Sequence, residues 1–164
     1  MSSSFEIPEV DHLTTGAVGP PGRRIFYLQA RHGEQVVSLR LEKAQVAALV
    51  AYLAGMLSDM PPADDIPSTG MDLIEPVVAE WVVGSLGVTY DEDADRVVIL
   101  AEELVEEGEE GARVRISATR EQIAALSVRG AEAVAAGRPP CPLCGQPLDP
   151  QGHTCPRLNG HRER

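Results

Sequence analysis

A chain of 164 residues has room for one compact domain and a short appendage. Its net charge of −11 disfavours a body that binds nucleic acid or an anionic membrane, because such binding depends on clustered lysine and arginine. Aromatic residues make up only 4% of the chain, so we expect a core of Val, Leu, Ile and Ala.

The start of the chain, MSSSFEIPEVDHL, has no basic cluster followed by an apolar run, and no stretch of about 18 apolar residues occurs in the sequence. The three cysteines all lie beyond residue 140, and an odd number does not fit a secreted disulfide framework. The sequence therefore predicts a cytoplasmic protein that does not enter a membrane.

Proline, glycine and serine clusters mark the expected boundaries along the chain. In order, we expect a flexible N-terminus at 1–9, a first βββα repeat at 10–59, a linker at 60–71, a second βββα repeat at 72–137, and a zinc-binding tail at 138–164. Paired prolines at 139–140 stop the preceding helix and begin the tail.

The two expected repeats resemble each other in sequence. The matched pairs of ranges are Val37–Leu49 with Val114–Leu126, Ile25–Ala30 with Val97–Glu102 and, more weakly, His12–Gly16 with Val82–Leu86. Alternating apolar residues predict strands, and each repeat closes with an apolar stripe at helical spacing. We therefore predict an α+β fold in which duplicated βββα units form an antiparallel sheet packed by two main helices, plus a C-terminal zinc-ribbon-like knuckle.

Helix starts and hairpin turns support this order. Thr119 and Gln122 have the spacing of a capping box, which predicts that the second helix begins beside them. His32-Gly33 is typical of a turn between two strands. The acidic block at 91–110 lacks the residue order of a calcium loop, so we expect a solvated hairpin face there.

Cys141 and Cys144 are separated by two residues and followed by Gly145, which is the pattern of a zinc knuckle. In such a knuckle both thiolates reach one tetrahedral ion, and backbone N–H groups turn toward the sulfurs. Cys155, which precedes a proline, begins the second half of the site. The spacing predicts a structural Zn²⁺ held by these three cysteines and a fourth ligand.

The fourth ligand is expected to be a histidine. We favour His161, which can fold back from beyond Cys155, while His153 remains the alternative. Arg157 is expected near the zinc, where its charge would offset three thiolates. A tail with reduced cysteines and no metal is the plain alternative, and a catalytic zinc would have only Asp149 as a local base.

Outside the tail, the first hairpin region contains four arginines that form an anion-binding patch if their side chains converge. They are Arg23, Arg24, Arg31 and Arg40. His12 and His32 have no evident catalytic relay, so we assign them no role, and no residues are assigned to catalysis. No glycine-rich phosphate loop is found.

The chain resembles an actinobacterial family of uncharacterised repeat proteins with a zinc-ribbon-like tail. The resemblance rests on Phe26–Arg31, Tyr90–Asp93 and Gly137–Gly145, and it spans most of the chain. It implies an actinobacterial setting and, as partners by association, a histidine-phosphatase-like protein or a lipid-kinase-like protein. It implies no particular activity.

The leading hypothesis is a non-enzymatic zinc-binding adaptor that offers an exposed sheet face or the acidic hairpin to another protein. One alternative is an enzyme or ligand-binding subunit for a phosphorylated small molecule, which the four arginines would hold. A weaker alternative is contact with nucleic acid through Arg138, Arg157, Arg162 and Arg164 of the tail.

Overall fold

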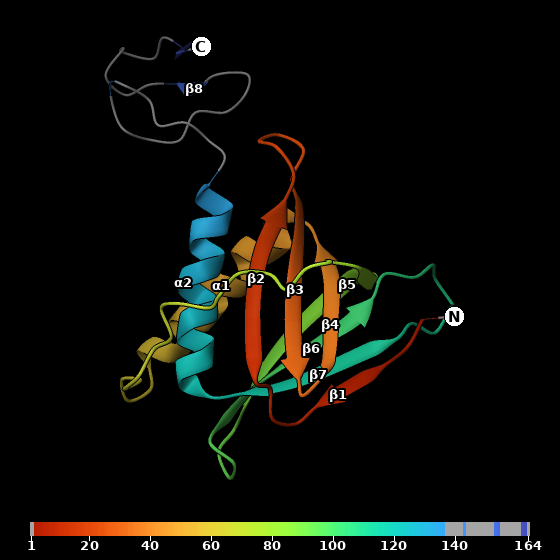
Figure 1. The fold of residues 1–164 in the computed structure, drawn as a ribbon, viewed down its shortest axis with the longest axis vertical. Helices are drawn as coiled ribbons and strands as arrows, with labels where there is room; N and C mark the ends of the chain where they lie inside the picture. Colours follow the sequence, from red (N-terminus) through yellow and green to blue (C-terminus); the bar gives the residue numbers. More distant parts are fainter. Residues whose placement is uncertain (1, 137–142, 144–152, 155–161, 164) are drawn as a thin grey trace.

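A computed structural model describes residues 2–136, Leu143, and the backbone of residues 153–154 and 162–163. Its architecture is mixed α+β, with a seven-stranded sheet and two helices, α1 (Lys43–Ser58) and α2 (Arg120–Ala135) (Figure 1). The sheet strands are β1 (Phe5–Ile7), β2 (His12–Val18), β3 (Ile25–His32), β4 (Gln35–Leu41), β5 (Ala79–Asp91), β6 (Arg96–Glu103) and β7 (Arg113–Ala118). Two short strands of the tail, β8 (His153–Thr154) and β9 (Arg162–Glu163), pair with each other.

The strand order is β1-β7-β6-β5-β4-β3-β2. The sequence predicts an antiparallel sheet, but two of the strand pairs are parallel. β4 pairs with β5 in parallel, and β1 pairs with β7 in parallel. The physical reason is the long connection between β4 and β5: it contains a helix, so the chain returns to the end of the sheet from which β4 began.

The sheet closes on itself through residues 5–18. β1 and β2 are the two end strands of the sheet, yet they follow each other in the chain. Between them, the Val10 N–H donates to the Ser117 carbonyl of β7 at 3.2 Å, and the Asp11 N–H donates to the Arg31 carbonyl of β3 at 2.8 Å. Residues 5–7, which the sequence places in a flexible N-terminus, are therefore part of the sheet.

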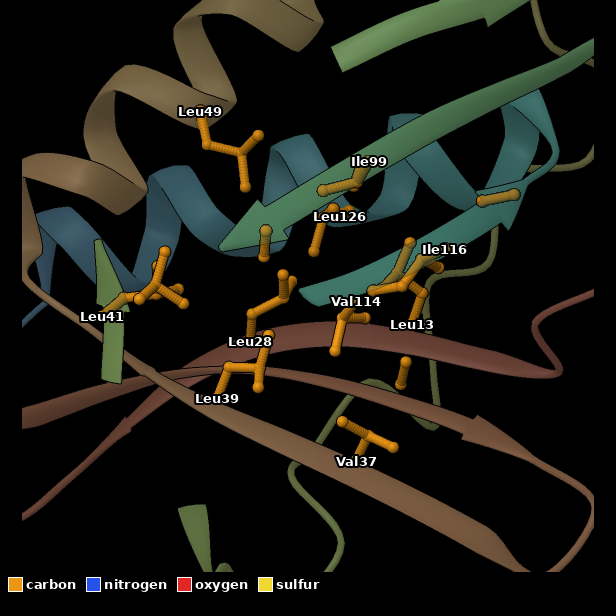
Figure 2. Packing of buried hydrophobic residues seen from close by; sticks show 14 of the residues in the cluster. Leu13, Leu28, Val37, Leu39, Leu41, Leu49, Ile99, Val114, Ile116 and Leu126 are labelled. Carbon is orange, nitrogen blue, oxygen red and sulfur yellow. The ribbon is translucent and has the colours of Figure 1, made fainter. Parts of the chain in front are cut away.

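The core lies between the two walls of the closed sheet and under the helices, which pack side by side (Figures 1 and 2). Aliphatic side chains dominate it, as expected from the low aromatic content. The largest fully buried core residues include Leu28, Leu39, Leu53, Ile99, Ile116 and Leu126. Phe26, Leu28 and Ala30 alternate inward along β3, which confirms the period-two pattern.

The two helices begin in the same way. Glu42 and Thr119 are the N-cap residues, and each helix has a glutamine at its third position that completes a capping box. Gln45 Nε2 also donates to the Val83 carbonyl at 3.1 Å, and Gln122 Nε2 donates to the Val10 carbonyl at 2.7 Å. Gln45 therefore fixes α1 to β5, and Gln122 fixes α2 to the segment between β1 and β2.

Residues 59–78 connect α1 to β5 and are called the strap below. The sequence predicts a linker at 60–71, and the strap has neither helix nor strand. It is nevertheless bound to the body: the Gln29 side chain, fully buried on the outer face of β3, pairs with Ile74 in both directions. Ile74 N–H donates to Gln29 Oε1 at 2.7 Å, and Gln29 Nε2 donates to the Ile74 carbonyl at 3.1 Å.

Candidate interaction surface

The predicted zinc site lies outside the described residues. This holds for Cys141, Cys144, Cys155, His161 and Arg157, and only the backbone of His153 is described, in β8. Within residues 2–136 and the short described pieces of the tail, no group of three or more His, Cys, Asp or Glu side chains could hold a metal ion. The zinc site in the tail therefore stays a prediction.

The four arginines of the first hairpin region do not meet. Arg24 Nη1 donates to the carbonyls of Ala133 at 3.0 Å and Ala136 at 2.6 Å, at the C-terminal end of α2. A cation at this end favours the helix because the last carbonyls carry partial negative charge. The guanidinium also lies 5.3 Å from the centre of the Phe26 ring. Arg24 thus has a structural role.

Arg31 lies at the other end of β3, about 23 Å away by strand rise. The two remaining arginines are both exposed: Arg23 follows the turn before β3, and Arg40 lies opposite Tyr27 on β4. The structure therefore does not gather the four guanidinium groups into one anion site.

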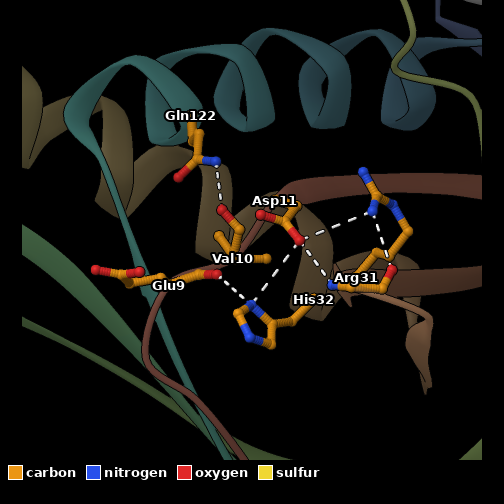
Figure 3. A network of polar contacts seen from close by, with 7 residues as sticks. Glu9, Val10, Asp11, Arg31, His32 and Gln122 are labelled. Carbon is orange, nitrogen blue, oxygen red and sulfur yellow. Dashed lines mark hydrogen bonds and ion pairs between the residues drawn. The ribbon is translucent and has the colours of Figure 1, made fainter.

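Arg31 belongs to a polar cluster at the ends of β2 and β3 (Figure 3). Asp11 Oδ2 accepts from the Gly33 N–H at 2.7 Å and lies 3.8 Å from both Arg31 Nη1 and His32 Nδ1. His32 Nδ1 also lies 2.7 Å from the Glu9 carbonyl. These side chains are well exposed, so the cluster contributes little beyond fixing the turn after β3.

His12, beside this cluster, is half-buried, and its Nε2 atom is buried without a hydrogen-bond partner among the described atoms. Burial lowers the pKa of His12 below its usual value, and the Arg31 charge lowers it further. A hydrogen bond to the Asp72 backbone opposes this by raising the pKa. No nucleophile or carboxylate completes a relay among the contacts described for His12.

The acidic hairpin between β6 and β7 encloses a polar hollow of about 390 Å³ lined by Glu102, Glu103, Glu109 and Glu110. Glu103 already has a structural role. Its carboxylate accepts from the Ser2 hydroxyl at 2.6 Å and from the Ala112 N–H at 3.0 Å, and these bonds lower its pKa. The expected solvated hairpin face is present, and one of its carboxylates, that of Glu103, stabilises the loop through these hydrogen bonds.

The outer face of β1, β7 and β6 is called the sheet face below; the sequence predicts an exposed sheet face but does not identify the residues that form it. This face forms a shallow hollow of about 560 Å³. Side chains that point outward along it are Glu6, Leu100, Glu102, Arg113 and Arg115. Leu100 is 38% exposed on it, and Arg115 Nη1 lies 3.7 Å from Glu6 Oε1.

A signal for this face exists in the sequence. Arg113, Arg115 and Ser117 alternate with buried residues along β7, so they share the outward side. Leu100 occupies an outward position of β6 opposite Arg115, where strand alternation leads one to expect a polar residue. An apolar residue such as Leu100 at an outward-facing strand position is thus the sequence signal that predicts an interaction surface.

None of the helices in the described part of the chain has the length and apolar character needed to cross a membrane. No curated protein and no solved structure matches the chain. A family model described as "Protein of unknown function (DUF3090)" matches residues 5–155, which include the whole closed sheet, both helices and most of the cysteine segment. The chain belongs to the DUF3090 family.

Proposed function

We propose that this protein is a non-enzymatic adaptor that binds another protein through the sheet face. The observation that carries the proposal is the exposed Leu100, which lines the same hollow as the charged residues Glu6, Glu102, Arg113 and Arg115. Exposed apolar side chains bordered by charged ones are typical of protein interfaces. The charges would set the orientation of the partner.

A structural zinc in the tail is part of the proposal. Its support is the ligand spacing of Cys141, Cys144 and Cys155 with His161 or His153. Zinc binding is worth on the order of 10 kcal/mol in small zinc modules, which is enough to fold a segment with few apolar residues. Thiolates kept free for a metal fit a reducing compartment, so we propose a cytoplasmic location.

We also propose that residues 12–58 and 79–135 are duplicated βββα units. The support is their common element order and the contacts of the two capping glutamines. Gln45 of the first segment donates to Val83 on β5, the first strand of the second segment, and Gln122 of the second segment donates to Val10, just before β2 of the first. Duplication would leave two related outer sheet faces. The strap crosses the face of β2 and β3, whereas the sheet face retains an exposed leucine.

Binding to the two partners implied by the resemblance tests the adaptor role. Isothermal titration calorimetry would measure the affinity of the zinc-loaded protein for a purified histidine-phosphatase-like protein and a purified lipid-kinase-like protein. We expect Leu100→Asp to weaken binding at least about tenfold, because a carboxylate would be desolvated in the interface. Val128→Asp is the matched control, because Val128 is 56% exposed on α2, away from this face.

Two results would contradict the adaptor proposal. One is binding that Leu100→Asp and Val128→Asp weaken equally, which would place the interface elsewhere. The other is the absence of binding to both candidate partners at protein concentrations near 100 μM. Even a weak specific complex, with a Kd of about 10 μM, would be largely formed at that concentration.

Metal content tests the zinc proposal. Protein purified without added metal should contain about one zinc per chain, and Cys141→Ser or Cys155→Ser should remove it. Comparing His161→Ala with His153→Ala identifies the fourth ligand, while His32→Ala, in the polar cluster of the sheet, should retain the metal. Zinc-free protein with freely reactive thiols would show that the tail is not a metal site.

A further inference from the structure

The strap follows a defined path from the end of α1 along α2. Arg120 Nη1, at the first residue of α2, donates to the Pro61 carbonyl at 2.8 Å. Further along, Arg129 Nη2 lies 3.1 Å from Asp72 Oδ1. Residues just beyond the end of α1 therefore lie at the start of α2, so the two packed helices run in opposite directions.

The strap then crosses the outer face of β2 and β3. The Thr14 hydroxyl donates to the Met71 carbonyl, and Leu73 lies over Gly16, where an added Cβ would be 3.2 Å from the leucine side chain. Thr14 and Gln29 are both fully buried beneath this segment. The junction between α2 and β2 is thus covered by a segment of the chain that leaves the other helix.

Within the described part of the chain, no segment covers the corresponding junction between α1 and β5. It contains a groove of about 490 Å³, lined by Ala48, Tyr52, Leu86, Gly87 and Val88. Tyr52 is the tenth residue of α1, as Arg129 is the tenth residue of α2, and it is 57% exposed. Gly87 pairs with Leu100, as Thr14 pairs with Gln29 beneath the strap. The groove therefore occupies the place that the strap covers in the other half.

The segment that leaves α2 begins like the strap. Met60-Pro61-Pro62 follows α1, and Arg138-Pro139-Pro140 follows α2. The first residue of each helix is basic, Lys43 in α1 and Arg120 in α2. Since the helices are antiparallel neighbours, the end of α2 lies near the start of α1, where the groove begins. The chain after residue 137 is longer than the strap, so it has the reach to cover the groove.

We propose that residues 138–164 dock in the groove between α1 and β5 of their own chain, with Tyr52, Leu86 and Val88 as their apolar contacts. The tether favours this occupant over a second copy or another protein, because a short linker supplies an effective concentration in the millimolar range. Leu100 has no group that could hold the segment as Gln29 holds the strap. The docked segment therefore ends at β5 and leaves the sheet face open.

Photo-cross-linking of the full chain tests this inference. Tyr52→p-benzoylphenylalanine places the cross-linker in the groove at an exposed position, so folding is retained. We expect a cross-link to a peptide within residues 138–164, in a product that migrates as a monomer and whose yield does not depend on protein concentration. Val128→p-benzoylphenylalanine is the control: it is exposed on α2, nearer in sequence to the tail, and should not capture it.

A second variant guards against nonspecific capture. Gly87→Arg fills the floor of the groove, where an added Cβ would have only Leu100 Cβ nearby, at 4.0 Å, and it should abolish the cross-link from position 52. Cross-linked dimers, equal capture from positions 52 and 128, or the absence of a cross-link to residues 138–164 would each overturn the inference. The proposal requires no metal and no partner, so its failure would leave the zinc and adaptor proposals to their own tests.

Discussion

His12 lies on the outer side of β2, beside Arg31 of β3 and against the strap backbone at Asp72. Its neutral ring fits this place, and a proton on the ring would add a charge that is partly removed from water and close to an arginine. Burial is the larger cause of the lowered pKa, and the Arg31 charge adds to it. The residue thus connects the stability of the strap to pH.

The sign of that dependence follows from linkage. In the unfolded chain the His12 ring titrates near pH 6.5, and in the folded protein it takes up its proton at lower pH. Between these two pKa values the unfolded state binds more protons, so the free energy of unfolding should fall as the pH drops below about 6.5. His12→Asn keeps an N–H for the Asp72 backbone and cannot titrate, so the dependence between about pH 5.5 and 7 should flatten.

Urea denaturation across that pH range measures the effect. His32→Asn is the matched control, since it removes an exposed histidine of the polar cluster and should leave the His12 contribution in place. Parallel pH profiles for the original protein and His12→Asn would refute this account of His12.

Single residues show why sequence reasoning stops short of the site. Arg24 and Arg31 have the same chemistry, yet one caps the carbonyl end of α2 and the other pairs with Asp11. Helix α2 lies almost a hundred residues further along the chain, so no local pattern could reveal the partner of Arg24. The cysteine spacing, in contrast, can be interpreted from the sequence alone, because the ligands of a zinc knuckle lie close together in sequence.

At the scale of elements, the contact between the two helices depends on Gly130. A Cβ at this position would overlap Val50 Cγ1 and lie 3.2 Å from Thr15 Cγ2. Val50 is β-branched and buried, so it has little freedom to move aside. The glycine therefore allows α1, α2 and β2 to approach one another closely.

Gly130→Ala should lower the free energy of unfolding by about 1 to 3 kcal/mol, because overpacking outweighs the better helix propensity of alanine. Gly55→Ala is the matched control in α1, where an added Cβ meets nothing within 4 Å. That substitution should raise stability by about 0.5 to 1 kcal/mol. Urea denaturation measures both, and a Gly130→Ala protein as stable as the original would show that the helices can separate at no cost.

Most elements could be predicted because their signals are local. The capping box at Thr119 and Gln122 marks the start of α2, and the alternation of Phe26, Leu28 and Ala30 marks β3. The strand match that belongs to the proposed duplication is harder to read from the sequence. The sequence alignment sets Ile25 against Val97, whereas the pairing of Phe26 with Leu41 and of Val97 with Ala118 sets Phe26 against Val97. A shift of one residue reverses the face of every side chain, and only the neighbouring strand reveals it.

At the scale of the whole molecule, the N-terminal strand completes the sheet. Ile7 is 1% exposed in β1, and Trp81 Nε1 donates to the Ser3 carbonyl at 2.9 Å. The sequence predicts a flexible N-terminus at residues 1–9 because this segment is rich in serine. Their partner strand β7 lies more than a hundred residues away, so the pairing has no local signature.

Deleting residues 2–7 should therefore lower the free energy of unfolding by at least about 3 kcal/mol, from the lost burial of Phe5 and Ile7. Trp81 is the only tryptophan, so its fluorescence should shift to the red in the folded variant as its contact with Ser3 is lost. Glu6→Ala is the control, because its exposed pair with Arg115 is worth less than about 1 kcal/mol. Unchanged stability and emission after the deletion would mean that the sheet does not need β1.

The parallel pairing of β1 with β7 also bears on how the chain folds as it is made. During synthesis from the N-terminus, residues 5–7 leave the ribosome long before residues 114–116, so the first strand must wait for the last. Until then β2, β3 and β4 can pair only among themselves and with β5. Contacts of such high sequence separation form late and slow folding, so the nascent chain keeps an open sheet edge through most of its elongation.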